Sequence, residues 1–245
     1  MGSITNNLQE VKGRISRAAS DNGRGAETVR LLAVSKTFSA DAVREAVAAG
    51  QRAFGENYVQ EALQKIESLA DLRSQIEWHL IGPLQSNKTR VVAEHFDWVQ
   101  SVDRLKIAER LSAQRPPGLP PLQLCLQVNI SAEASKSGAD PADVLALAQA
   151  ISKLPNLRLR GLMAVPATAA DGADASARRA PHRALFDLWQ ALRVQGRGWD
   201  ADVDTLSCGM SADLEDAVAA GSTMVRIGSA IFGARPPVGA RVSPQ

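Results

Sequence analysis

The stretch VRLLAVSKTFSADAVREAVAAG, residues 29–50, has the form of a β-strand followed by an α-helix. Four apolar residues, Leu31 to Val34, match a short buried strand, and the residues after Ser39 repeat apolar side chains at helical spacing. Ser39 is a favourable helix N-cap and Gly50 a favourable stop. Between the two elements stands Lys36, a cation at the end of an apolar strand. Such a lysine is either a solvated cap or a reactive amine.

The same strand–helix alternation continues along the chain, and SADLEDAVAAG at 211–221 repeats the capping pattern. Eight strand–helix units with no gap predict an α/β fold, a single (β/α)8 TIM barrel over residues 1–245. An open doubly wound sheet is the alternative, but its GxGxxG fingerprint is missing. The β-prone runs are 31–35, 52–55, 77–81, 98–102, 122–130, 157–164, 203–208 and 223–227, and the helical patterns are 39–49, 58–70, 86–95, 103–113, 141–153, 178–194 and 211–220.

The chain before the first strand has apolar residues at three- and four-residue intervals, including Ile4, Leu8, Val11 and Ile15. This pattern predicts an extra amphipathic helix within residues 1–28 that packs on the barrel. Three Pro-, Ala- or Gly-rich segments are expected to be mobile. They are QRPPGLPP (114–121), PATAADGADASARRAP (166–181), whose loop we extend to His182, and the tail at 234–245.

Composition excludes several classes of function. The net charge is +2 and aromatic residues make up 4%, which argues against a nucleic-acid partner. No apolar run approaches the roughly 20 residues needed to span a bilayer, and the N-terminus lacks the apolar core of a secretory signal. The two cysteines, Cys125 and Cys208, match no metal spacing. We therefore expect a cytoplasmic protein with no metal and no membrane contact.

The working face of a TIM barrel is the carboxyl end of its strands, and the loops after the seventh and eighth strands commonly bind phosphate. Here those loops are SCGMS (Ser207, Cys208, Gly209, Met210, Ser211) and RIGS (Arg226, Ile227, Gly228, Ser229). Serine hydroxyls, glycines that let amides approach, and a helix predicted to begin near Ser211 all suit an anion. Each loop alone fits a helix cap or a strand-end turn. Together they predict a phosphate site.

A phosphate site sharpens the interpretation of Lys36. Burial and a nearby cation would lower the pKa of its amine and make it nucleophilic toward an aldehyde. Pyridoxal 5′-phosphate (PLP) carries both an aldehyde and a phosphate, and would satisfy both ends of the site. Arg226 is then a candidate donor to the pyridine nitrogen. The alternatives for Arg226 are a phosphate clamp or a structural ion pair.

Several longer motifs resemble the pyridoxal phosphate homeostasis proteins, a PLP-binding group related to the N-terminal barrel of alanine racemase. The resemblance covers 31–233 and rests on AVSKTF, FGENYVQEA, WHLIGPLQSNK, SVD, VNISAEASKSG, GLMAVPA and LSCGMSADLEDAVAAGSTMVRIGSAIFG. It implies PLP held as a Schiff base on Lys36, with Asn57 and His79 lining the pocket or supporting it. It also implies phosphate contacts from Ser207, Ser211, Gly228 and nearby backbone, with Arg226 beneath the pyridine nitrogen. Cys208 departs from the methionine common in the family.

The resemblance implies a carrier that buffers or delivers PLP, with PLP-dependent apoenzymes as partners and without significant turnover. A racemase needs a base on each face of the substrate, and Tyr58, the sole tyrosine, is expected at the rim. We expect no second domain and a monomer. Lys136, in a basic loop after the fifth strand, is a candidate for PLP transfer. The alternatives are a fold-type III racemase or decarboxylase completed by a partner, and a PLP-free aldolase using Lys36.

Overall fold

The computed structural model of the chain describes residues 3–131, 137–167, 172–196, 198 and 203–234. Two predictions fall outside these ranges: the Lys136 loop, and the tail expected to be mobile, of which only Ala234 is described. Among the described residues, no helix is both long and apolar enough to cross a bilayer.

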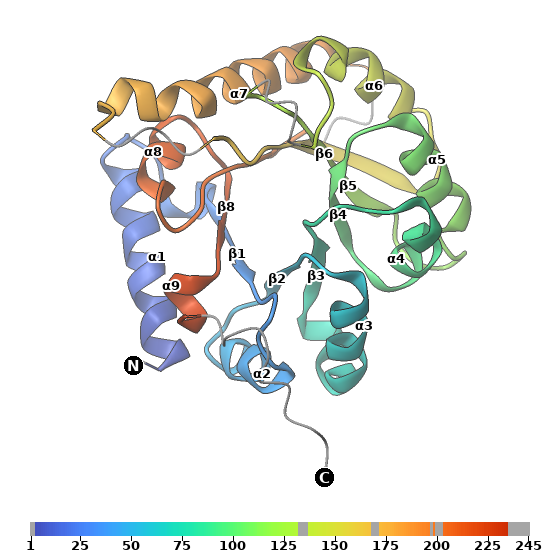
Figure 1. Ribbon diagram of the computed structural model, residues 1–245, viewed down its shortest axis with the longest axis horizontal. Helices are drawn as coiled ribbons and strands as arrows, with labels where there is room; N and C mark the ends of the chain where they lie inside the picture. The colour runs from blue at the N-terminus through green and yellow to red at the C-terminus, as the bar shows by residue number, and fades with distance from the viewer. Residues whose placement is uncertain (1–2, 132–136, 168–171, 197, 199–202, 235–245) are drawn as a thin grey trace.

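Eight parallel strands pair in chain order, and β8 closes against β1, which confirms the predicted (β/α)8 barrel (Figure 1). The predicted strands are all present, most of them shifted or shortened by one to three residues at their ends. The strands are β1 (Arg30–Val34), β2 (Ala53–Glu56), β3 (Glu77–Leu80), β4 (Trp98–Val102), β5 (Leu122–Gln127), β6 (Leu157–Met163), β7 (Thr205–Ser207) and β8 (Met224–Ile227).

The α-helices lie around the outside of the strands (Figure 1). They are α1 (Ile4–Ser20), α2 (Ala40–Ala48), α3 (Val59–Ser68), α4 (Thr89–His95), α5 (Leu105–Gln114), α6 (Val144–Ile151), α7 (Ala175–Gln195), α8 (Leu214–Ala219) and α9 (Ser229–Phe232). Short 3₁₀ helices also occur: η1 (Ala26–Thr28), η2 (Ala70–Gln75), η3 (Ser86–Lys88) and η4 (Pro141–Asp143).

Side chains of each strand alternate between two environments. Leu31 and Ala33 of β1 belong to the main core between the strands and the helices. Leu32, between them, packs with Ala53 and Met224 in a separate cluster inside the barrel. This alternation follows from strand geometry, in which successive side chains point to opposite faces. It also fixes which residues at the strand ends face the barrel interior.

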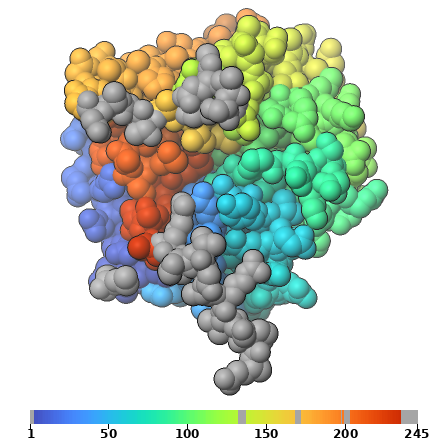
Figure 2. Space-filling model, viewed as in Figure 1, coloured from blue at the N-terminus to red at the C-terminus, as the bar shows by residue number. Residues whose placement is uncertain are grey.

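The predicted extra N-terminal helix is α1, which lies beside α8 and α9 (Figure 1). The hydroxyl of Ser3 caps it by accepting the Asn6 N–H, and its buried face includes Leu8, Val11 and Ile15. The Asn7 side-chain amide donates to the carbonyl oxygen of Ile231 in α9 at 2.8 Å. α1 therefore buttresses the last strand–helix unit. Figure 2 shows the surfaces of the chain's first and last parts adjoining, as the pairing of β1 with β8 requires.

Four helices begin three residues away from their predicted starts: α4, α6 and α8 begin later, and α7 begins earlier. α7 begins at Ala175, so part of the segment predicted to be a loop is helical, and placing His182 in that loop was wrong. Asp174 caps this helix by accepting the Ala177 N–H at 2.8 Å, and alanine and arginine are strong helix formers. α8 begins at Leu214, three residues later than predicted.

Candidate functional site

The pairing of β1 with β8 brings Lys36 close to the turn at Gly228. Ala33 lies opposite Ile227 in the sheet. One step further, a Cβ added to Gly228 would lie 3.1 Å from the carbonyl oxygen of Val34. Lys36 follows Val34 by two residues. The ends of the first and last strands therefore form one continuous edge.

The alternation of side chains puts Lys36 on the lumen side of that edge. Ser35 points outward, where its hydroxyl donates to Glu56 Oε1 at 2.6 Å, and its N–H continues the ladder to Gly55. The half-buried Lys36 is the next residue. Thr37 then turns the chain with a positive φ of 68°, and its N–H donates to Glu61 Oε1 at 2.5 Å. A β-branched residue in this conformation is strained, and such strain persists only where the surroundings impose it.

A buried ion pair beneath Lys36 holds this turn. Lys65 Nζ contacts Glu56 Oε1 at 2.8 Å and Glu61 Oε1 at 2.7 Å, and donates to the Ser35 carbonyl oxygen at 2.6 Å. Burial raises the pKa of Glu56, although Lys65 and the Ser35 hydroxyl oppose the shift. Sequence analysis missed this cluster; only the Glu61–Lys65 spacing of four residues on a helix pointed to it.

The loop after β7 is shaped by its own backbone. Gly209 has φ +96°, and a Cβ there would lie 2.5 Å from the Cβ of Ala217. Its carbonyl oxygen accepts the Arg226 N–H at 2.9 Å. The Ser211 carbonyl oxygen accepts from Arg14 of α1 at 3.1 Å. Because α8 begins only at Leu214 and has six residues, the expected helix terminus at Ser211 is wrong.

A second pair, missed by sequence analysis, fixes the outer side of this loop. Asp213 Oδ1 accepts the Met210 N–H at 2.6 Å, and Asp213 Oδ2 lies 3.1 Å from Nε2 of the buried His182. Burial lowers the pKa of His182, but the bond to Asp213 and the nearby Cys208 outweigh it and raise the pKa to about 9. His182 is therefore cationic at neutral pH. Only a correct helix assignment for α7 would have placed it here.

Arg226 is buried at the carboxyl end of β8. Its guanidinium donates to the Ser207 carbonyl oxygen at 2.7 Å, to the Ser207 hydroxyl at 2.9 Å and to the Ala164 carbonyl oxygen at 2.7 Å. Burial lowers the pKa of Arg226. A guanidinium remains charged in proteins all the same, so Arg226 is a fixed donor between β6 and β7.

A chain of polar side chains runs from Ser207 down the barrel interior. The Ser207 hydroxyl donates to Gln100 Oε1 at 2.7 Å, and Gln100 Nε2 lies 2.9 Å from Nδ1 of His79. His79 stacks on Trp98, and its Nε2 lies 2.5 Å from Glu77 Oε1. Burial lowers the pKa of His79, so the ring is neutral, with Nδ1 accepting and Nε2 donating. His79 therefore lies a layer below the strand ends, and the unpredicted Gln100 connects it to Ser207.

Some buried oxygens at the strand ends lack hydrogen-bond partners among the described residues. Asn57 Oδ1, after β2, and Ser101 Oγ, in β4, form no hydrogen bond to any described residue. Buried polar atoms are rarely left unpaired, so each calls for a ligand or solvent.

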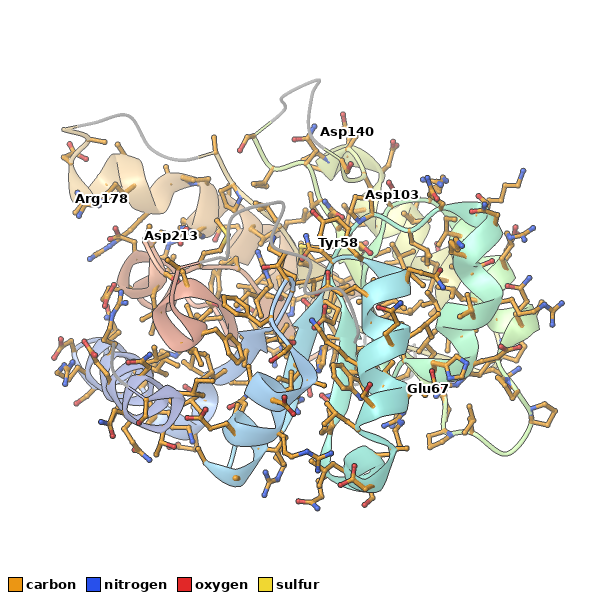
Figure 3. The ribbon with its side chains drawn as sticks, turned by 60° about the horizontal axis from the view of Figure 1, so that its bottom comes forward. Tyr58, Glu67, Asp103, Asp140, Arg178 and Asp213 are labelled. Atoms are coloured by element: carbon orange, nitrogen blue, oxygen red, sulfur yellow. The ribbon has the colours of Figure 1, made fainter. Side chains whose placement is uncertain are left out.

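In Figure 3, Tyr58, Asp103, Asp140 and Asp213 lie at one end of the molecule and Glu67, at the far end of α3, lies at the other.

The predicted residues fall into three groups. Lys36, Asn57, Ser207, Gly209, Ser211, Arg226 and Gly228 all lie at the carboxyl ends of the strands. His79 lies deeper. Met210 is 39% exposed, and the side chain of Ile227 is packed in the core between strands and helices. In the ranges that the structure covers, no cluster of metal-ligating side chains occurs.

The chain is similar to known proteins over nearly its whole length. The alanine racemase N-terminal domain family matches residues 3–236. The chain is 59% identical to the pyridoxal phosphate homeostasis protein of Pseudomonas aeruginosa over 96% of this chain and 97% of that one, and 52% identical to the Escherichia coli protein of the same name over 96% and 98%.

Solved structures show the same likeness. PipY of Synechococcus elongatus with PLP bound has a TM-score of 0.76 at 41% identity, covering 89% of this chain and all of that one. Alanine racemase from Corynebacterium glutamicum, with a TM-score of 0.65 and 16% identity over 96% of this chain and 62% of that one, shares the fold. By its matched domain and by its identity to these relatives over nearly its whole length, the chain belongs to the pyridoxal phosphate homeostasis protein family.

Proposed function

We propose that this protein binds PLP at the carboxyl end of its barrel, holds it covalently through Lys36, and buffers or delivers it to PLP-dependent apoenzymes. The proposal rests on one observation, the pairing of β1 with β8. This pairing puts the Lys36 backbone beside the Gly228 turn. A single small molecule with an aldehyde at one end and a phosphate at the other could then contact both. The PLP bound by the related PipY supports this ligand.

The residues present fit the cofactor. The unpartnered Asn57 Oδ1 and Ser101 Oγ offer polar contacts at the ends of the strands. The loop at Gly209 packs closely on Ala217 of α8, which fixes its backbone, and the Gly228 amide donates to no described residue. These backbone groups, with the Ser211 hydroxyl, would hold the phosphate. The Ser207 hydroxyl, expected from sequence to join them, is instead engaged with Gln100 and Arg226.

The roles of the two cations differ. PLP supplies an aldehyde that condenses with an amine and a ring that withdraws electrons. Lys36 provides the amine. Arg226, held by Ser207 and Ala164, would donate to the ring nitrogen and cannot give it a proton, so the ring would remain a weak electron sink.

The same residues argue for storage rather than turnover. A racemase needs a second base opposite the lysine. Tyr58 is 58% exposed at the start of α3, and His79 is buried with a lowered pKa, so neither is placed as that base. The unpartnered side chains of Asn57 and Ser101 at the strand ends are not bases at neutral pH.

Borohydride reduction followed by peptide mass spectrometry tests the proposal. The phosphopyridoxyl group should be on Lys36, and Lys36→Arg should lose both the adduct and the visible absorbance. Lys106→Ala, which removes an exposed lysine of α5, is the matched control and should keep both. Modification elsewhere, or a colourless protein, would refute PLP binding at this site and favour an aldolase. Amino-acid racemisation by the loaded protein would refute the absence of turnover.

A further inference from the structure

A cavity of about 820 Å³ opens at the amino-terminal end of the barrel, away from Lys36. Its position follows from its lining, because Arg30, Glu77 and Trp98 are the first residues of β1, β3 and β4. Its volume falls in the range of small-molecule sites. Six arginines line it: Arg30, Arg52, Arg73, Arg115, Arg158 and Arg160.

The cavity carries an excess of positive charge. Glu77 and Asp97 are its only lining carboxylates, so six guanidinium groups face two negative charges, an excess of four. Asp204, outside the lining, pairs with Arg160. Leaving Arg158 aside, the five other arginines then face three carboxylates, an excess of two. The net charge of the whole chain is also +2, so this one cavity carries as much excess positive charge as the entire molecule.

Several of these guanidinium groups are already oriented. Arg115 donates to the carbonyl oxygens of Ala93 at 2.7 Å and Phe96 at 2.8 Å, bonds that fix its position without neutralising its charge. Burial lowers the pKa of Arg115, and the charge of Arg73 adds to this effect. Arg52 likewise donates to main-chain carbonyls, at 2.7 Å to Val47.

The other arginines have carboxylate partners at the cavity edge. Arg30 lies 2.8 Å from Glu77, and Arg73 lies 2.7 Å from Asp97. The side chains of Arg30 and Arg73 are 43% and 41% exposed, so both can reach a ligand while keeping these contacts. Arginine presents a planar fork that matches phosphate oxygens in pairs.

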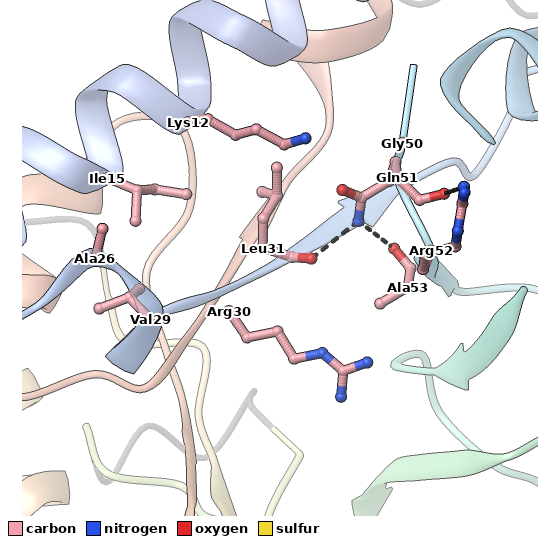
Figure 4. A pocket seen from close by; sticks show the side chains of 10 residues that line it. All are labelled: Lys12, Ile15, Ala26, Val29, Arg30, Leu31, Gly50, Gln51, Arg52 and Ala53. Atoms are coloured by element: carbon pink, nitrogen blue, oxygen red, sulfur yellow. Dashed lines mark hydrogen bonds between the residues drawn. The ribbon is translucent and has the colours of Figure 1, made fainter. Parts of the chain in front are cut away.

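A smaller neighbouring pocket of about 330 Å³ extends the cationic surface (Figure 4). It shares Arg30 and Arg52 with the larger cavity and adds Lys12 from α1. Its floor is held by Gln51, whose side-chain amide donates to the Leu31 and Ala53 carbonyl oxygens at 2.9 and 2.8 Å. Lys12 therefore adds a further cation beside the arginines.

We propose that this arginine cavity is a second ligand site, for a compact polyanion carrying two or more linked phosphate groups. The excess of positive charge matches a di- or triphosphate better than a monophosphate. Positive charge gathered in a hollow surface concentrates such anions. The site is separate from the strand ends that carry Lys36, and the proposal does not depend on PLP binding.

Isothermal titration calorimetry of the full chain with inorganic triphosphate tests the proposal, at low ionic strength because salt screens exposed charges. Binding of one triphosphate should persist in protein saturated with PLP and be at least about tenfold tighter than that of inorganic phosphate. Loss of triphosphate binding on PLP saturation would overturn the proposal, because the triphosphate would then occupy the PLP site at the carboxyl end of the barrel. Equal affinity for the two anions would also overturn it. Adenosine triphosphate, run in parallel, distinguishes a nucleotide ligand from a free polyphosphate.

Two lining variants and one control localise the site. Arg30→Gln and Arg73→Gln should each weaken triphosphate binding by about fivefold or more. Arg44→Gln makes the same change of charge at an exposed pair with Asp71, outside the cavity, and should leave the affinity unchanged. Circular dichroism checks that the variants are folded. If one of the two lining variants fails to fold, the other tests the site by itself. An equal effect of all three would show a diffuse charge effect and refute the site.

Discussion

The guanidinium of Arg226 donates to both oxygens of Ser207, to the carbonyl at 2.7 Å and to the hydroxyl at 2.9 Å. The Ser207 hydroxyl can therefore turn its own proton only toward Gln100, which it does at 2.7 Å. No carboxylate of a described residue is in hydrogen-bond contact with Arg226, so its direct partners are carbonyl and hydroxyl oxygens, and the Asp213 carboxylate acts on its charge only from a distance. A donor held this rigidly has its direction set before any ligand arrives.

Replacing Arg226 by lysine should therefore destabilise the fold although the charge is kept. A lysine has no planar fork and cannot satisfy Ser207 and Ala164 together, which leaves a buried carbonyl oxygen unpaired. We expect a loss of about 2 kcal/mol in the free energy of unfolding, measured by urea titration. Arg104→Lys, at an exposed pair with Asp103, is the control and should change little. Wild-type stability of Arg226→Lys would show that these hydrogen bonds are not needed.

The His182–Asp213 pair should make stability fall at alkaline pH. The pKa of His182 is raised from 6.5 to about 9 in the folded protein. Its stabilising effect is therefore complete below about pH 6.5 and is lost as the pH rises through about 9. Relative to His182→Gln, the wild type should lose up to about 3 kcal/mol between about pH 6 and pH 10. Urea titrations across this range measure the difference.

A direct titration separates His182 from the two other histidines. Nuclear magnetic resonance of the ring protons should show one histidine titrating near pH 9, and that signal should vanish in His182→Gln. His95→Gln removes an exposed histidine at the end of α4 and should leave the alkaline signal in place. If all titrating signals lie near pH 6.5, the Asp213 contact does not hold His182 protonated.

Removing Lys65 should destabilise the turn that carries Lys36. Lys65→Met leaves Glu56 buried and uncompensated, which costs about 3–5 kcal/mol. The pKa of Glu56 is raised in the fold, so protonation favours the folded state and stability falls as the pH rises above 4.5. The defect should therefore be larger at about pH 8 than at about pH 5. Thermal unfolding of Lys65→Met and of Glu56→Gln/Lys65→Met measures it; a double variant no more stable than the single one would contradict this account.

The barrel was predictable from sequence because each strand is a short apolar run and each helix has its own period. Lys36 and Arg226 were predictable as site candidates because, once the eight strands are assigned, both residues fall at strand ends. Glu56–Lys65 and His182–Asp213 were not, since they join elements through side chains far apart in sequence. The helix expected at Ser211 failed because Asp213 accepts the Met210 N–H and holds the chain in a turn until Leu214.

Replacing Gly209 by alanine tests whether the loop after β7 depends on its close packing against α8. Gly209→Ala would suffer both a positive φ of +96° and a contact of 2.5 Å with the Cβ of Ala217. Gly50→Ala is the matched control, because Gly50 has φ +87° with no atom nearby, so it carries the backbone strain alone. We expect Gly50→Ala to lose about 1 kcal/mol in the free energy of unfolding with PLP affinity unchanged. Gly209→Ala should lose more stability and weaken PLP binding by about tenfold, because Ala217 can yield only by moving α8 and the loop together. Equal losses in the two variants, with PLP affinity intact in both, would mean that the approach of the loop to α8 has no part in holding the phosphate.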